Sequence, residues 1–261
     1  MTTYQTMIRD GGLGLAVQPT ILIYALWRSG THWLSEMVSD LTGLPSFYHA
    51  EEGAPYADET LEQINQHREN TVLIRHLCAS PDRLLRHTEA LNIPVILLFR
   101  DPRDVIASQV NMRKHREGYR PGLPPFPDMP LDEILDWELA NHGDVYHRLL
   151  PRWAGAAHPM LLTVRYEDLL SDVQRELARV AVFLNLDVSL NEIRRVAARH
   201  VLPGLMPATG TVRAGESARR GAIGDYRHQF TLAQQRRLTD ALLETLVKLG
   251  YECGPSAADA G

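Results

Sequence analysis

The chain has little of what marks several large classes of protein. Its two cysteines, Cys78 and Cys253, are too few for a disulfide framework, and neither stands in a metal-ligand spacing. The formal net charge is −5, which argues against a nucleic-acid polymer as partner. No apolar run reaches the length of a membrane span, and residues 1–14 show no secretory signal. We therefore expect a cytoplasmic protein without a metal site.

The residues that are present alternate between apolar runs and segments of helical periodicity. A chain of 261 residues, 44% of them hydrophobic, can bury a large core and suits a single α/β domain over residues 1–261. Helical segments follow the predicted strands, which implies right-handed crossovers and a central parallel β-sheet flanked by helices. The predicted strands are the run that begins at Pro19 and residues 71–74, 94–99 and 160–164.

Three segments carry glycine, proline or polar residues in place of periodicity. Residues 46–70 are predicted to be a surface excursion, and residues 118–130 and 200–226 to be long loops. The chain is predicted to close with one amphipathic helix over residues 231–249.

Basic and aromatic residues gather where the predicted strands end. Ligands of parallel α/β sheets bind beyond the carboxyl ends of the strands, so we expect these residues to line a site for an anion. They are Arg28, Arg75 with His76, Arg100, and Arg165 with Tyr166.

The first strand end carries a phosphate-binding pattern, Trp27-Arg28-Ser29-Gly30-Thr31-His32-Trp33. A strand–turn–helix joint presents free backbone N–H groups to an anion, and Arg28 would add a positive charge. The pattern differs from the nucleotide-triphosphate loop G-x-x-x-x-G-K-[ST], because threonine follows Gly30 in place of lysine. Taken alone, it also fits a joint with no ligand.

Four stretches, in order, resemble the motifs of sulfotransferases that use 3′-phosphoadenosine 5′-phosphosulfate (PAPS). Trp27–Trp33 resembles the 5′-phosphosulfate loop P-K-S-G-T-T-W, and Phe99–Ser108 resembles the 3′-phosphate motif. Arg165–Leu169 resembles the Y-E-D segment, and Arg219–Tyr226 resembles R-K-G-x-x-G-D-W. The resemblance implies a P-loop-NTPase-like sulfotransferase fold with a PAPS-binding core over about 20–231.

The resemblance implies PAPS as co-substrate, 3′-phosphoadenosine 5′-phosphate (PAP) as product, and no metal. Within it, Trp33 matches the aromatic residue stacked on adenine, and Tyr166 the tyrosine that touches the nucleoside. Structural roles in local ion pairs or in the core are the alternatives for these arginines and aromatic residues. The nucleotide-binding residues implied are Arg28, Ser29, Gly30, Thr31, His32, Trp33, Arg100, Ser108, Tyr166, Arg219, Arg220 and Gly221.

Two catalytic residues are also implied. His76, in Ile74-Arg75-His76, takes the place of the histidine of the family's K-T-H and is the expected general base. Arg28 takes the place of the loop lysine and would stabilise the leaving phosphate, although arginine cannot donate a proton there. The alternative for His76 is a hydrogen-bonded structural histidine.

The acceptor is expected to be a small molecule with a hydroxyl or amine group, and the sequence does not choose among phenols, steroids, sugars and lipids. The family's dimer segment falls on Arg227–Arg236, where its final glutamate is replaced by arginine, so the oligomeric state stays open. Acceptor loops are expected at about 46–70, 111–130 and 200–217, with Arg75, Phe47, Tyr48 and Tyr119 as substrate-binding residues.

Two alternative functions remain. A P-loop kinase of related topology is disfavoured by the absent loop lysine and by the lack of a magnesium-binding pattern. A non-catalytic nucleotide-binding protein would make His76 dispensable. His32, which replaces the second threonine of the family's loop, has no assigned role.

Overall fold

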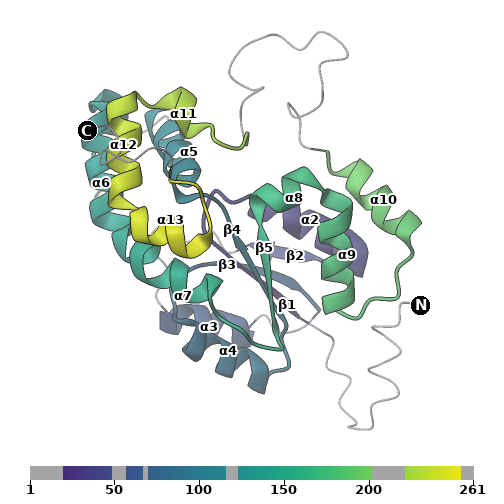
Figure 1. The fold of residues 1–261 in the computed structure, drawn as a ribbon. Helices are drawn as coiled ribbons and strands as arrows, with labels where there is room; N and C mark the ends of the chain where they lie inside the picture. Colours follow the sequence, from purple (N-terminus) through teal and green to yellow (C-terminus); the bar gives the residue numbers. More distant parts are fainter. Residues whose placement is uncertain (1–19, 49–56, 67–69, 116–122, 202–220, 254–261) are drawn as a thin grey trace. The chain divides into compact units, whose positions relative to one another are not determined.

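The computed structural model describes residues 20–48, 57–66, 70–115, 123–201 and 221–253 (Figure 1). Contacts between residues divide the chain into two compact units. The first unit comprises residues 1–99 and 156–206, and the second comprises residues 100–155 and 207–261.

The first unit contains a five-stranded parallel sheet with the strand order β2-β3-β1-β4-β5. The predicted parallel sheet is therefore confirmed. β1 and β4 are buried along their whole length, as expected for inner strands covered on both faces. The strands are β1 (Ile21–Ala25), β2 (Ser46–Tyr48), β3 (Val72–His76), β4 (Val95–Phe99) and β5 (Leu161–Arg165).

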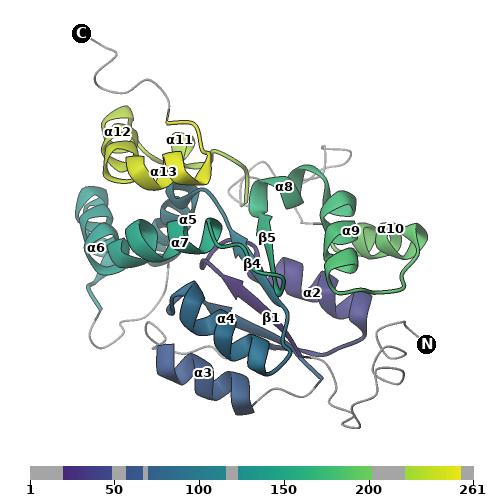
Figure 2. The same ribbon diagram turned by 60° about the horizontal axis from the view of Figure 1, so that its bottom comes forward.

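Helices cover both faces of this sheet. The chain moves in one direction from β1 to β2 and in the other from β3 to β4, so right-handed crossovers place the connecting helices on opposite faces. Figure 2 shows α2 and α9 on one side of the sheet and α3 and α4 on the other. The helices are α2 (Thr31–Thr42), α3 (Ala57–Gln66), α4 (Pro81–Ala90), α8 (Tyr166–Ser171), α9 (Val173–Phe183) and α10 (Leu190–Arg199).

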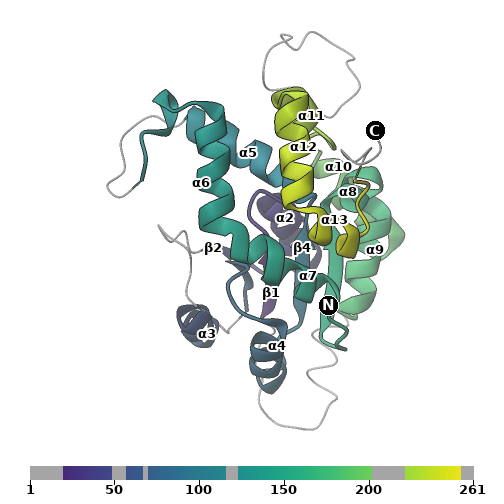
Figure 3. The same cartoon turned by 60° about the vertical axis from the view of Figure 1, so that its left-hand side comes forward.

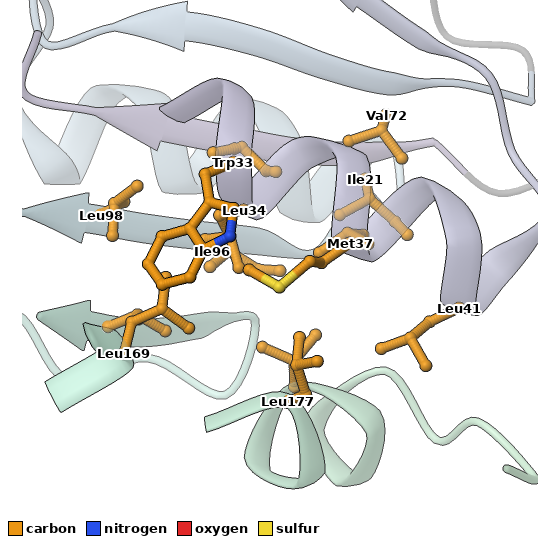
Figure 4. Packing of buried hydrophobic residues seen from close by; sticks show 14 of the residues in the cluster. Ile21, Trp33, Leu34, Met37, Leu41, Val72, Ile96, Leu98, Leu169 and Leu177 are labelled. Carbon is orange, nitrogen blue, oxygen red and sulfur yellow. The ribbon is translucent and has the colours of Figure 1, made fainter. Parts of the chain in front are cut away.

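The core on the α2 face fixes that helix against the sheet. Trp33, Leu34 and Met37 of α2 pack on Ile21, Ile96 and Leu98 of the strands and on Leu177 of α9 (Figure 4). Because α2 begins immediately after the turn that follows β1, this packing holds the helix N-terminus in a fixed place at the end of β1.

The second unit is helical in the residues that the structure describes. Asp132 of α6 accepts a hydrogen bond from Gln234 of α12 at 3.0 Å, and the two helices lie side by side (Figure 3). Arg113 and Glu138 form a buried ion pair between α5 and α6. The elements are α5 (Pro102–Lys114), η1 (Phe126–Asp128), α6 (Leu131–Asp144), η2 (Val145–Leu149), α7 (Leu150–Ala154), α11 (Tyr226–Gln229), α12 (Leu232–Ala241) and α13 (Leu243–Leu249).

Two sequence-based expectations were wrong. The segment 46–70, predicted to be an excursion, contains the edge strand β2 and the helix α3. A three-residue strand carries too little periodicity to detect, and Gly53 and Pro55 hid the helix that follows. The closing helix is two helices, because the chain breaks at Leu242 between α12 and α13. In the part of the chain that the structure describes, every helix is too short or too polar to span a membrane.

Candidate functional site

The turn after β1 has an unusual backbone. Arg28 and Gly30 both lie in the left-handed region, with φ of 61° and 84°, and α2 starts at Thr31. The carbonyl of Gly30 accepts the N–H of Leu34 at 3.0 Å, so the helix is already formed at its first turn. A turn of this kind at a helix N-terminus directs backbone N–H groups towards one point, where they can hold an anion.

Gly30 is also required by a close contact. A Cβ atom at this position would lie 2.9 Å from two ring carbons of Tyr166, the first residue of α8. The Tyr166 ring therefore lies against the backbone of the turn, and only glycine combines this approach with a φ of 84°.

The side chains of the turn divide into buried and exposed groups. Ser29 is fully buried, and its hydroxyl has no hydrogen-bond partner among the residues described. Arg28 and His32 are exposed, whereas Thr31 is buried. Burying a hydroxyl without a hydrogen-bond partner costs free energy, so a ligand that accepts a hydrogen bond from Ser29 would fit at this turn.

Trp33 is 8% exposed and belongs to the core on the α2 face. Its indole N–H donates to the carbonyl oxygen of His200, and its ring meets the Tyr166 ring edge to face at 6.2 Å. The imidazole of His200 bonds to Asp40 of α2 at 2.8 Å. The end of α10 is thus attached to the same helix that begins at the turn.

His76 ends β3, where it pairs with Ala25 at the end of β1. Its half-buried ring meets the Trp27 ring edge to face at 6.4 Å. Burial, together with the charges of Arg75 and His32, lowers the pKa of His76 to about 4. Since the His32 charge acts on His76, the exposed histidine of the turn and the predicted base are electrostatically linked.

The predicted acceptor-binding residues lie in different surroundings. Arg75 is 3% exposed and lies in β3 beside Tyr24 of β1. Phe47, half-buried, and Tyr48 belong to the edge strand β2. Tyr119 lies outside the described residues, as do the nucleotide-binding residues Arg219 and Arg220.

In the second unit, Arg100 lies just before α5 and is 3% exposed. Its Nη2 donates to the carbonyl oxygen of Ala222 at 2.6 Å and lies 3.3 Å from the carboxylate of Asp104. Ser108, two turns further along α5, is partly buried. The structure thus places the predicted phosphate-binding arginine against residues that directly follow Arg219-Arg220-Gly221 in the chain.

Asp104 is the residue of this region whose role the sequence does not reveal. Its two carboxylate oxygens accept the N–H groups of Gly224 at 2.8 Å and Tyr226 at 3.0 Å. Burial raises the pKa of Asp104, while the Arg100 charge opposes that rise. The pattern Arg100-Asp101-Pro102-Arg103-Asp104 suggests only local ion pairs, because the partners of Asp104 lie about 120 residues away.

Asp101 stands at the start of α5, with Pro102 at the first helical position. Its carboxylate caps α5 by accepting the Arg103 N–H at 2.9 Å, and it also pairs with the Arg103 guanidinium at 2.7 Å. Arg103 lies 4.6 Å from the centre of the Tyr226 ring. Within the second unit, the N-terminal turn of α5 is therefore the anchor for Gly224–Tyr226.

The model of the Sulfotransferase domain family matches residues 18–250 of the chain. Sulfotransferase 1A1 of Rattus norvegicus is 24% identical in an alignment that covers 89% of this chain and 86% of the rat protein. Sulfotransferase 2B1 of Mus musculus is 25% identical in an alignment that covers 87% of this chain and 71% of the mouse protein.

Two solved structures share the fold. Mouse sulfotransferase SULT7A1 complexed with PAP has a TM-score of 0.64 at 19% identity, with 94% of this chain and 90% of that chain covered. Retinol dehydratase in a complex with retinol and PAP has a TM-score of 0.58 at 18% identity, with 94% and 86% covered.

Proposed function

Because the chain belongs to the sulfotransferase domain family, we propose that it transfers a sulfuryl group from PAPS to a hydroxyl or amine of a small-molecule acceptor. The observation that carries the proposal is the Trp27–Gly30 turn. It combines two left-handed residues, the start of α2 and a buried Ser29 hydroxyl that no described residue bonds. These features suit a bound phosphosulfate.

The 5′-phosphosulfate is assigned to this turn. The N–H groups of residues 29–33 would bind its oxygens, and the Ser29 hydroxyl would complete its own hydrogen bonding by donating to one of them. Arg28 would stabilise the negative charge that grows on the phosphate as the sulfur–oxygen bond breaks. The Arg28 side chain is exposed, so it can reach a phosphate bound at the surface of the turn.

The 3′-phosphate is assigned to Arg100 and Ser108, with Arg219, Arg220 and the N–H of Gly221. The contacts that support this are those of Arg100 with Ala222 and Asp104, since they hold the residues after Gly221 beside a buried guanidinium. Arginine binds phosphate through paired N–H groups, which favours this residue type in both assignments.

His76 is assigned as the general base. In the proposed reaction it takes the proton of the acceptor hydroxyl, the acceptor oxygen bonds to sulfur, and the electron pair of the breaking sulfur–oxygen bond leaves with PAP. A pKa of about 4 keeps the imidazole neutral at pH 7, so it can accept that proton. The charge of a bound phosphosulfate would favour the protonated form and strengthen the base during the reaction.

The acceptor is assigned only by class. Retinol dehydratase, which shares the fold, is solved with the small molecules retinol and androsterone. Phe47 in β2 and Arg75 in β3 are the proposed substrate-binding residues, which would place the acceptor near these two strands. Transfer from labelled PAPS to a panel of alcohols, phenols and sugars would identify it.

Thermal stabilisation by nucleotides tests the proposal. PAP should raise the melting temperature by more than ATP with magnesium does, because the site is proposed to hold a 3′-phosphate and lacks the loop lysine of ATP-binding loops. A larger shift with ATP would favour a kinase. A PAP shift without sulfuryl transfer to any acceptor of the panel would favour a non-catalytic nucleotide-binding protein.

A further inference from the structure

Tyr24 lies within β1, is fully buried, and reaches the segment that follows His76. Its Oη accepts the N–H groups of Cys78 and Ala79, both at 2.7 Å. The same hydroxyl donates towards the Cys78 sulfur at 3.4 Å. Burial, more than the neighbouring thiol, raises the pKa of the Tyr24 phenol well above its usual value, so the hydroxyl keeps its proton.

These bonds begin where the backbone pairing of β1 with β3 stops. Ala25 pairs with His76, and its carbonyl accepts the N–H of Leu77 at 3.0 Å. The next residue, Leu26, donates its N–H to the carbonyl oxygen of Leu98, which belongs to β4, the other neighbour of β1. β1 then enters the Trp27–Gly30 turn, so the Tyr24 hydroxyl supplies the acceptor that the strand backbone no longer offers.

The hydroxyl would be unfavourable at this position without these bonds. Phenylalanine would fill almost the same volume in the sheet interior, and a buried hydroxyl costs free energy unless it is hydrogen-bonded. Its removal would leave two backbone N–H groups to find other partners, one of them in Ala79, which is only 2% exposed. The hydrogen bonds to Cys78 and Ala79 thus explain why a tyrosine, and not a phenylalanine, stands at position 24.

We infer that Tyr24 is a positioning residue for the reaction: it fixes the backbone on the far side of His76 and so fixes where the imidazole lies. The inference rests on His76 acting as the base, as proposed above. Pairing with β1 holds His76 itself, and the Tyr24 hydroxyl holds the backbone of Cys78 and Ala79, two and three residues further along the chain. Because proton transfer requires a base within hydrogen-bond reach, a small displacement of this backbone reduces the rate.

Tyr24→Phe tests the inference, because it removes the hydroxyl and keeps the ring. We expect kcat to fall about tenfold while the KM for PAPS stays within about twofold, since misplacement of a reacting group slows the chemical step without removing nucleotide contacts. Hydrogen exchange at the Cys78 and Ala79 amides should become faster. Thr88→Val is the matched control: it removes a buried hydroxyl that donates to the Leu84 carbonyl at 3.1 Å within α4, and we expect wild-type kcat.

A double-mutant cycle separates positioning of His76 from general structural damage. In a His76→Ala background, Tyr24→Phe should leave the residual rate unchanged, because no imidazole remains to be positioned. An equal fold-loss in both backgrounds would overturn the inference, and so would an unchanged kcat in a folded Tyr24→Phe protein. If His76→Ala alone keeps full activity, the proposed base is wrong, whatever the Tyr24 variant does.

Wild-type protein provides a measurement that does not depend on the variant folding. The amides of Cys78 and Ala79 should exchange as slowly as that of Leu77, which belongs to the β1–β3 pairing. Rapid exchange at both amides would show that Tyr24 does not hold this segment and would overturn the inference.

Discussion

β3 places the imidazole of His76 where it stays neutral well below physiological pH. Burial lowers its pKa to about 4, and the charges of Arg75 and His32 act in the same direction. A neutral imidazole is the form that accepts a proton, so this environment favours the protonation state that the proposed base requires. The cost is lower basicity, which a bound anion would restore.

His76→Ala is expected to lower kcat about 10²- to 10⁴-fold and to leave PAP affinity nearly unchanged, because it would remove the proposed general base and keep the proposed nucleotide contacts. In the wild type, kcat/KM should fall as the pH drops through about 4, where the free enzyme protonates His76, and not at 6.5. Steady-state kinetics across pH check both. His147→Ala, which changes an exposed histidine, should behave as wild type.

The same pKa has a consequence for stability. Between pH 6.5 and about 4 the unfolded chain binds a proton at His76 that the folded chain does not, so folded-state stability falls as the pH falls through this window. His76→Gln should reduce that acid sensitivity by at most about 3 kcal/mol. A pH profile as steep in the variant as in the wild type would contradict the low pKa.

At the scale of elements, the turn between β1 and α2 depends on tertiary contact as well as on its own sequence. The sequence shows Gly30 and predicts a phosphate-binding turn around it. The reason that no other residue fits is the Tyr166 ring, 136 positions further along the chain, which lies against the turn. The sequence motif and the packing of α8 therefore select the same residue for different reasons.

Gly30→Ala is expected to lower the free energy of unfolding by about 2 to 4 kcal/mol, because the left-handed backbone penalty and overpacking against Tyr166 add. Gly43→Ala is the matched control: it has a φ of +71°, and its Cβ would meet nothing within 4 Å. We expect it to lose only about 1 kcal/mol. Urea unfolding compares the two, and equal losses would mean that the Tyr166 contact is unimportant.

The helix start at Asp101 illustrates how far local sequence reaches. An aspartate before proline at the first helical position is a strong local signal for a helix start, and Asp101 does cap α5. Three residues later, Asp104 looks the same in sequence but bonds the backbone of Gly224 and Tyr226. A cap acts within one turn of helix and is predictable, whereas partners about 120 residues away are set by tertiary folding.

At the scale of the whole molecule, each compact unit carries one of the two proposed groups of anion-binding residues. The Trp27–Gly30 turn belongs to the first unit, and Arg100 with Gly221–Tyr226 belongs to the second. The family model spans residues of both.

PAP binding should slow hydrogen exchange in both units, because its 5′- and 3′-phosphates are assigned to different ones. The amides of residues 29–33 and those of Gly221–Tyr226 are the segments to compare with and without PAP. α13 serves as an internal reference and should not change. Protection in the first unit alone would contradict the assignment of the 3′-phosphate to Arg100.

The sequence by itself determined the parallel sheet, the main helices and the turn after β1, because hydrophobic periodicity and turn chemistry are local properties. It also carried the family resemblance through motifs of a few residues each. Only the tertiary structure decided that Tyr166 closes on Gly30, that Asp104 holds Gly224 and Tyr226, and that Tyr24 bonds the segment after His76. Each of these contacts joins residues distant in sequence, and the energy that selects them exists only once the chain has folded.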